Sequence, residues 1–306
     1  RVWMRARQTA PRREPGDIAL PRPRPPIEAR PNRLSVTRVD DLQRDPYAIY
    51  ARMILRLEPL NPLNGPLDAR QTGTAIHDAL DAFEADGAEA SPERLLTLIE
   101  TSLIDAGLPI EDILSNRAVR RRTIDWYLTE WRAPRLPFIK ALRNEKSGRL
   151  DLDIAGAPFA LTAKADRIEL RQDGTLAILD FKTGRFATAA QINVGLDQQM
   201  PLQALLAQNG GFDTVPAATV SELGYVSFKS AYDAVTIGES PRSPLHDVTP
   251  GDMAETARAG LSRLISDYRK PETAYLSAPR VQFIKFDYGY NRLARRDEWT
   301  SESGHD

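Results

Sequence analysis

The chain of 306 residues is 42% hydrophobic and 27% charged, with a formal net charge of −1, which is the composition of an ordinary globular protein. The near-zero charge means that any surface for nucleic acid must be local. The absence of cysteine excludes disulfides, thiolate zinc sites, cysteine nucleophiles and iron–sulfur clusters, and three histidines argue against a multi-histidine zinc site.

The first 33 residues differ in composition from the rest of the chain. Residues 1–33 hold nine arginines and seven prolines and show almost no apolar periodicity. Proline lacks the backbone donor and fixes φ, so the run from Pro21 to Pro26 cannot be helix or central strand. We predict an extended linker that tethers the domain, with a basic arm that follows DNA as the alternative. One domain then covers 34–300, and the tail 301–306 is expected to be disordered.

The first half of the domain has helical periodicity. Ser91 followed by Pro92 is the pattern of a helix N-terminus, and Gly107 suits a helix end. Residues 58–72 contain three prolines and a glycine and are predicted to form a loop. From the apolar spacing we expect helices after a cap at Thr37, from Tyr47 to Ile54, over 73–86, from Pro92 to Gly107, and over 116–133.

The second half begins with a change in period from 3.6 to 2. Alternating residues and the turns at 155–158 and 172–174 predict a three-stranded antiparallel meander that ends on Leu176 to Lys182. After it we expect a helix over 190–207 whose main part starts near Gln198, a strand pair at 220–229 and 232–237, and a long helix from Met253 to near Pro271. This order predicts the α+β class, with helices packed on a mixed sheet.

Two carboxylates and one amine are predicted to meet at the end of the meander. Asp180 and Lys182 point to the same face of their strand. In a tight hairpin, residues pair when their numbers sum to about 347, which makes Asp166 a cross-strand neighbour of Asp180. Two adjacent carboxylates repel unless a cation bridges them. A surface Asp166 that pairs with a nearby basic residue is the alternative.

The ligand chemistry indicates Mg²⁺ or Mn²⁺, because carboxylates, a backbone carbonyl and water suit a hard octahedral cation. The carbonyl of Phe181 lies between Asp180 and Lys182 in sequence and is expected to be a further ligand. A charged Lys182 cannot bind a metal. We expect it to orient or deprotonate the attacking water, or to stabilise the transition state.

Four other polar residues are candidates for the same site. His77 lies on a predicted helix beside apolar residues, where a half-buried structural histidine is the alternative. Gln199 and Gln203 lie at a helix start, and could bond to phosphate, bond to the site carboxylates, or belong to a solvated face. Glu145 precedes the first predicted strand and could reach the site.

Together these residues resemble the RecB-type nuclease branch of the PD-(D/E)XK superfamily. The motifs occur in the order of that branch: Gly73-x-x-x-His77, Asp166-Arg167-Ile168-Glu169, Asp180-Phe181-Lys182-Thr183-Gly184 and Gln199-x-x-x-Gln203. The resemblance implies a restriction-endonuclease-like core. It also implies metal ligation by His77, Asp166, Asp180 and the Phe181 carbonyl, with Lys182 as the catalytic lysine and Gln199 in the glutamine position.

The segments at 34–37, 44–51 and 55–60 resemble the entry to the nuclease domain of AddB-type helicase–nuclease subunits. That resemblance implies a C-terminal part of a longer protein, with a helicase-like N-terminal part, an AddA-type partner subunit and a role in processing double-strand DNA ends. Its substrate would be unwound single-stranded DNA. On this view, the residues expected to contact DNA are Arg117, Arg120, Arg121, Arg167 and Gln203. A catalytically inactive DNA-binding module and a stand-alone Cas4-like nuclease are the alternatives.

Three features depart from the family pattern. Gln203 replaces the usual tyrosine, Ala163 replaces a glycine, and the four cysteines that hold an iron–sulfur cluster in many relatives are absent. We expect packing by Tyr288, Tyr290 and Trp299 to replace the contact which that cluster makes. No apolar run approaches the ~18 residues that span a bilayer, and no signal-peptide pattern appears in these residues. We therefore expect a cytoplasmic, nucleoid-associated protein without membrane partners, and the initial Arg indicates a piece of a longer chain.

Overall fold

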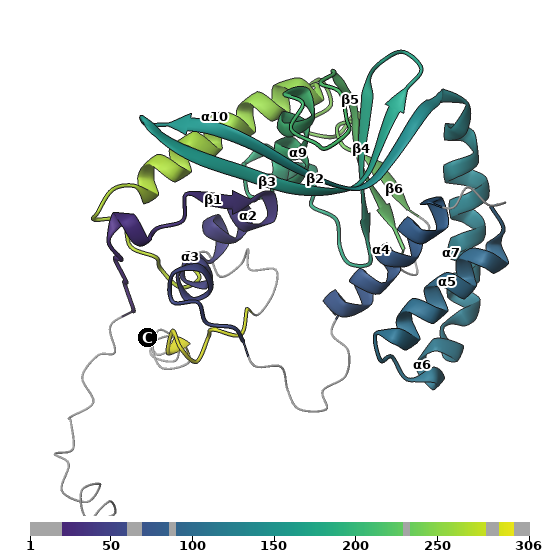
Figure 1. Ribbon diagram of the computed structural model, residues 1–306, viewed down its shortest axis with the longest axis horizontal. Coiled ribbons are helices and arrows are strands. Elements are labelled where there is room, and N and C mark those ends of the chain that lie inside the picture. Colours follow the sequence, from purple (N-terminus) through teal and green to yellow (C-terminus); the bar gives the residue numbers. More distant parts are fainter. Residues whose placement is uncertain (1–19, 60–68, 86–89, 229–232, 280–287, 297–306) are drawn as a thin grey trace, which may run out of the picture.

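The computed structural model describes residues 20–59, 69–85, 90–228, 233–279 and 288–296. Its centre is a six-stranded mixed sheet in the order β1-β3-β4-β5-β6, with β2 paired to β3 (Figure 1). The strands are β1 (Arg33–Ser35), β2 (Ile139–Ile154), β3 (Ala157–Arg171), β4 (Leu176–Lys182), β5 (Val220–Ser227) and β6 (Ala234–Thr236). The predicted α+β class and the antiparallel meander are confirmed.

The strand β3 organises the sheet because three strands share its two edges. One edge pairs with β2 along its whole length. The other edge pairs with β1, in parallel, at 160–162 and with β4, antiparallel, at 167–170. Residues 163–166 lie between these two paired segments, so neither β1 nor β4 pairs with this edge of β3 at Asp166. Beyond β4 the sheet continues through the parallel pair β4–β5 and the short β6.

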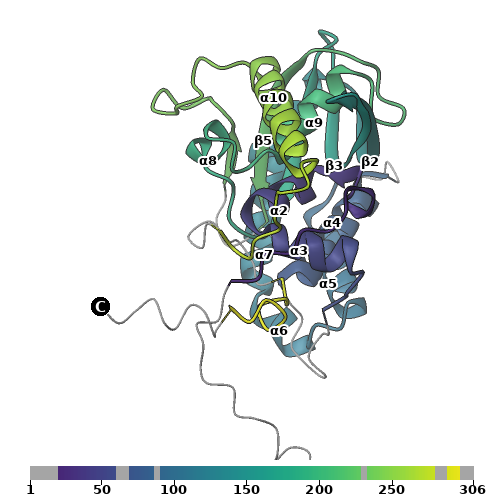
Figure 2. The ribbon, with the colours of Figure 1, turned by 90° about the vertical axis from the view of Figure 1, so that its left-hand side faces the viewer.

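Helices cover the sheet in two groups (Figures 1 and 2). The first group packs its apolar residues with Leu161, Ile178 and Leu223 of the sheet, and the second packs around Phe181 and Val226. The first consists mainly of α2 (Val36–Arg44), α9 (Gln199–Gln208) and α10 (Pro250–Tyr268). The second consists of α4 (Ala69–Ala85), α5 (Pro92–Asp105), α6 (Ile110–Ser115), α7 (Arg117–Trp126) and the π-helical η3 (Tyr127–Arg132).

Shorter helical segments connect these elements: η1 (Ile27–Ala29), α3 (Pro46–Ile49), the π-helical η2 (Tyr50–Ile54), η4 (Ala133–Phe138) and α8 (Ala189–Asn193). The predicted break before the main part of the 190–207 helix is confirmed, because α8 ends at Asn193 and α9 starts at Gln199. The Ser91 cap of α5 is also confirmed, since its side chain accepts the Arg94 N–H. Within the described residues, no helix has the length and apolar character to cross a membrane.

Several predicted boundaries were wrong. The N-cap of α2 is Ser35 rather than Thr37, because the Ser35 hydroxyl accepts the Arg38 N–H. Helix α4 begins at Ala69, inside the stretch predicted as a loop, and the short α6 was not predicted. Strand β2 begins at Ile139, well before the residues whose alternation predicted it. Its first half is partly exposed on both faces and so shows no period-2 pattern.

The described part of the predicted linker is attached to the domain. Arg30 is buried and donates hydrogen bonds to the carbonyls of Pro25, Tyr268, Lys270 and Pro271. The Asn32 carbonyl accepts the Ala160 N–H. These contacts use the backbone and one arginine, which explains why hydrophobic periodicity did not reveal them. The domain boundary therefore lies before residue 34; residues 1–19 and the tail 301–306 lie outside the described residues.

Two tyrosines join the C-terminal segment to the N-terminal helices. Tyr288 donates to Asp41 (2.6 Å), and Tyr290 donates to the Leu57 carbonyl (2.6 Å). Tyr290 also packs with Tyr47, in a small core of its own. These contacts join the two ends of the domain; that they replace the contact made by the iron–sulfur cluster in relatives stays a prediction, and Trp299 lies outside the described residues.

Candidate active site

The end of β4 brings together a carboxylate, an amine and an amide. Asp180 is only 2% exposed and forms an ion pair with Lys182, with 2.6 Å between Oδ2 and Nζ. Gln199, at the start of α9, donates its Nε2–H to Asp180 Oδ1 (2.6 Å) and accepts from Lys182 Nζ at Oε1 (3.2 Å). Three roles were open for Gln199: a bond to phosphate, a bond to a site carboxylate, or a place on a solvated face. In the structure its side chain bonds to the carboxylate of Asp180.

Asp166 lies where β3 and β4 diverge. The last paired residues are Arg167 and Leu179, so Asp166 and Asp180 are next in line, within one residue of the predicted register. The Phe181 N–H, which the diverging strand leaves without a ladder partner, donates instead to Asp166 Oδ2 (2.8 Å). This bond holds the Asp166 carboxylate at the end of β4 and leaves its other oxygen facing α4.

His77 reaches the same place from α4. Its Nδ1 lies 3.5 Å from Asp166 Oδ1, and its ring contacts the edge of Phe181. Burial lowers the pKa of His77, but the hydrogen bond and negative charge of Asp166 outweigh burial and raise it. Gly73 permits this approach, since a Cβ there would lie 3.1 Å from Thr183 Oγ1. A Cβ at this position would require Thr183, the residue after β4, to shift by a few tenths of an ångström.

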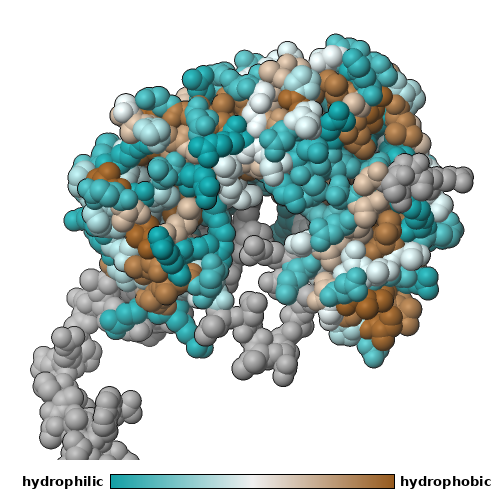
Figure 3. All heavy atoms as spheres, viewed as in Figure 1, coloured by the Kyte–Doolittle hydropathy of each residue, from teal (hydrophilic) through white to brown (hydrophobic). Residues whose placement is uncertain are grey.

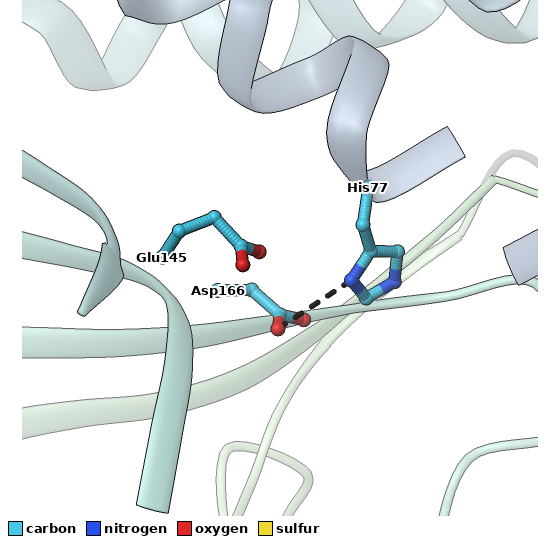
Figure 4. Close-up of side chains that lie close together, drawn as sticks. All are labelled: His77, Glu145 and Asp166. Carbon is cyan, nitrogen blue, oxygen red and sulfur yellow. Dashed lines mark ion pairs between the residues drawn. The ribbon is translucent and has the colours of Figure 1, made fainter. Parts of the chain in front are cut away.

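Glu145 completes a group of three possible ligands (Figure 4). Donor atoms of His77, Glu145 and Asp166 all lie within 4.8 Å of one another. Glu145 was predicted to precede the first strand, but it lies inside β2, and its carboxylate forms an ion pair with Lys164 of β3. The donor set of one imidazole and two carboxylates, with Asp180 beside it, fits a hard divalent cation such as Mg²⁺ or Mn²⁺.

The electrostatics of the group also favour a cation. Burial raises the pKa of Asp180 to about 6; Lys182 partly offsets this effect, and the nearby Asp166 adds to it. Two neighbouring carboxylates repel each other, and a positive ion between them relieves that repulsion. The ring of Phe181 packs with Tyr127, Trp131 and Phe228, as core. The metal role expected for its carbonyl stays a prediction.

Two residues predicted to contact DNA are fully buried. Arg167 forms ion pairs with Glu84 and Glu169, and Gln203 donates to the Lys164 carbonyl. Neither side chain reaches a surface where DNA could lie, so both are corrected to structural residues. The alternation of side chains along β3 could have predicted the burial of Arg167, because Arg167 shares a face with the apolar Leu161 and Ala165.

The arginines of α7 are partly neutralised by neighbours. Arg117 pairs with Glu100 (3.2 Å), and Arg121 pairs with both Glu93 (2.7 Å) and Asp125 (2.9 Å). Arg120 donates to the Ile113 carbonyl (2.7 Å). Their contact with DNA stays a prediction. On the face shown in Figure 3, a hollow lies between the part that carries α2 and α3 and the part that carries α4 to α7, with mostly hydrophilic side chains above it.

Sequence reasoning missed a buried clamp that holds Gln199 in place. Asp40 of α2 accepts the Gln198 N–H (2.8 Å). Arg44, one turn later, donates to the Leu196 carbonyl and lies 3.6 Å from the Asp197 carboxylate. All of these side chains are buried. Because the three clamped residues immediately precede Gln199, α2 fixes the start of α9 relative to β4. The available signal was that Asp40 and Arg44 follow the apolar Val36 at four-residue steps and so lie on the buried side of α2.

We expect Asp40→Ala to lower the free energy of unfolding by about 1–3 kcal/mol, because it leaves the buried Gln198 N–H without this acceptor. Asp40→Asn keeps a carbonyl oxygen at the same place and is expected to lose less. Urea unfolding of both variants measures the difference. Equal losses in the two variants would show that the bond to Gln198 contributes little.

A comparison with known proteins identifies the class. The sequence profile of the PD-(D/E)XK nuclease superfamily matches residues 33–280. The chain belongs to this superfamily, and the restriction-endonuclease-like α+β fold with helices on both sides of a mixed sheet is confirmed. Members of this superfamily are typically nuclease-type phosphodiesterases and generally use divalent metals, so membership implies this class of activity.

The curated relatives are longer proteins. An uncharacterized protein of Rickettsia bellii is 27% identical over 256 residues, covering 78% of this chain and 30% of the relative. An uncharacterized protein of Rickettsia felis is 28% identical over 220 residues, covering 69% of this chain and 26% of the relative. The chain thus spans less than a third of their length. A solved structure, "Crystal structure of SSO0001", aligns with 78% of this chain and 75% of its own, at 13% identity and a TM-score of 0.34.

Proposed function

We propose that this chain is the Mg²⁺- or Mn²⁺-dependent DNA exonuclease domain of an AddAB-type helicase–nuclease, which hydrolyses single strands unwound from double-strand ends. The observation that carries the proposal is the convergence of His77 and Asp166 with the Asp180–Lys182 pair at the diverging ends of β3 and β4. Metal-dependent hydrolysis of a phosphodiester uses a cation at the phosphate, and a positive group near the attacking water assists it; this arrangement can supply both.

The residues divide the chemistry between them. His77, Asp166 and Asp180 would hold the metal, which when bound neutralises charge on the phosphate and acidifies water. Lys182 lies beside Asp180 with its pKa raised: burial lowers that pKa, but the charge and hydrogen bond of Asp180 together with the charges of Asp166 and Asp197 outweigh burial. Lys182 is therefore an ammonium group near neutral pH. We assign it the role of a hydrogen-bond donor that holds the water and stabilises the developing negative charge, rather than that of a base.

Gln199 has a positioning role in this proposal. Its amide nitrogen holds Asp180 and its amide oxygen holds Lys182, so one side chain fixes the two groups relative to each other. The order of the four motifs and the length of the relatives support the wider assignment. In that assignment the partners are an AddA-type subunit, a helicase-like N-terminal part of the same protein and single-stranded DNA at the nucleoid.

A nuclease assay tests the proposal. We expect the chain to degrade an end-labelled single strand with Mg²⁺ or Mn²⁺ and not with EDTA. Asp166→Asn should lower the rate by a factor of about 10³, because it removes a charged metal ligand. Asp151→Asn is the matched control, since its carboxylate forms an exposed pair with Arg149 on the same sheet. Full activity of Asp166→Asn would refute the site, and binding without cleavage would indicate an inactive module.

A further inference from the structure

Glu145 occupies an unusual backbone position directly beside the site. The neighbouring pairs Asn144–Arg167 and Lys146–Ala165 keep the register of β2 with β3, which places Glu145 opposite Asp166. Within this ladder Glu145 has φ of +50°, a conformation that non-glycine residues seldom adopt. The carboxylate faces Asp166 and His77 (Figure 4). The strand is distorted at the one residue whose side chain adds a third donor to the cluster.

The partner of Glu145 in this arrangement is Lys164. Lys164 lies on β3 two residues before Asp166, so the two side chains emerge on the same face. Its side chain is 62% exposed, whereas that of Glu145 is 17% exposed. An exposed lysine can leave such a pair for water at small cost, because surface ion pairs are weak. A half-buried glutamate that lost Lys164 would need another positive charge.

We infer that Glu145 is a further protein ligand of the divalent cation, beside His77, Asp166 and Asp180, and that Lys164 pairs with the Glu145 carboxylate until the cation takes its place. This inference rests on the proposed metal site and adds a residue that none of the four motifs contains. The donor atoms already lie within 4.8 Å of one another, so small rotations would place them around one ion. A doubly charged ion attracts the carboxylate more strongly than the single charge of Lys164.

The inference makes opposite predictions for the two members of the pair. Mn²⁺ binding to the full chain, without DNA, is measured by isothermal titration calorimetry and by the electron paramagnetic resonance signal of free Mn²⁺. We expect Glu145→Gln to weaken binding about ten-fold or more, since even outer-shell partners of metals matter at that level. Lys164→Met is expected to tighten binding about two- to five-fold, because the competing ion pair is removed.

A double variant and a fold control complete the experiment. In Glu145→Gln/Lys164→Met, the gain from the lysine substitution should disappear. A purely structural pair would instead weaken binding in both single variants, and that result would overturn the inference, as would wild-type affinity in Glu145→Gln. Urea midpoints identify any variant that has lost its fold. If wild-type protein itself binds no Mn²⁺, the proposed function fails together with the inference; if only the Glu145 result fails, the proposed function stands.

Discussion

Lys182→Met is expected to lower the rate of DNA cleavage by a factor of about 10³, because it removes the positive group that we place at the developing negative charge. Binding of Mn²⁺ should remain, since the lysine is not a ligand. Single-turnover cleavage of a labelled strand measures the first effect and calorimetry the second. The titration is run near pH ~8, because Lys182 lowers the pKa of Asp180 and its loss would raise that pKa above about 6.

Lys182→Arg separates the two roles that a lysine can have. Arginine stays protonated at any accessible pH, so it can donate a hydrogen bond and supply charge but cannot accept a proton. If Lys182 acts as an ammonium donor, Lys182→Arg should retain more activity than Lys182→Met. Equal and complete loss in both variants, with intact metal binding, would favour proton transfer by the neutral amine and would contradict the role derived from its raised pKa.

The pairing of Asp166 with Asp180 was predictable because a hairpin turn sets the register of its strands. The predicted turn at 172–174 was correct, and side-chain parity then placed the two carboxylates together. Arrival of His77 and Gln199 at the same place depended on tertiary packing, and only the family resemblance indicated it. Two contacts show why. Helix α4, which carries His77, approaches Thr183 at Gly73, and Asp40 of α2 holds the residue before Gln199; no local sequence pattern relates these segments to each other.

Glu145 and Arg167 show where local patterns are insufficient. The first half of β2 is half-exposed on both faces, so the strand that carries Glu145 had no alternation to reveal it. Arg167 was expected to contact DNA on the family resemblance, although it shares a strand face with apolar residues. Its burial becomes possible only through Glu84 and Glu169, and Glu84 lies 83 positions away in sequence. A charged residue in a buried strand position predicts that a partner exists but does not say which one.

Arg167 belongs to a buried ion-pair ladder between α4, η3, η4 and the sheet. In it four arginines face three glutamates: Arg132, Arg135, Arg167 and Arg171 with Glu84, Glu169 and Glu222. Arg135 and Arg167 also lie over the ring of Trp131. The ladder holds an excess of one positive charge. Removing a carboxylate therefore leaves buried positive charge without compensation, whereas removing an arginine leaves every glutamate with a partner.

Glu84→Ala is expected to lower the free energy of unfolding by about 3–5 kcal/mol, the range for breaking a buried pair from one side. Arg167, which is 0% exposed, forms ion pairs with Glu84 and Glu169, and the substitution leaves only the pair with Glu169. Arg167→Met should cost less, at most about 2 kcal/mol, because Glu84 keeps Arg132 and Glu169 keeps Arg135. Urea unfolding with an unchanged m-value measures both.

Glu84 also connects this stability to the site. It lies seven residues, about two helical turns, after His77 on α4, while Arg167 directly follows Asp166 on β3. The Glu84–Arg167 pair therefore fixes α4 at the place where His77 must meet Asp166. We expect Glu84→Ala to weaken Mn²⁺ binding even where the protein remains folded. Glu255→Ala, which removes an exposed pair with Arg258, is the matched control and should change stability by less than about 0.5 kcal/mol. If Glu84→Ala lowered the free energy of unfolding no more than this control or than Arg167→Met does, the excess of positive charge would not determine the stability of the ion-pair ladder.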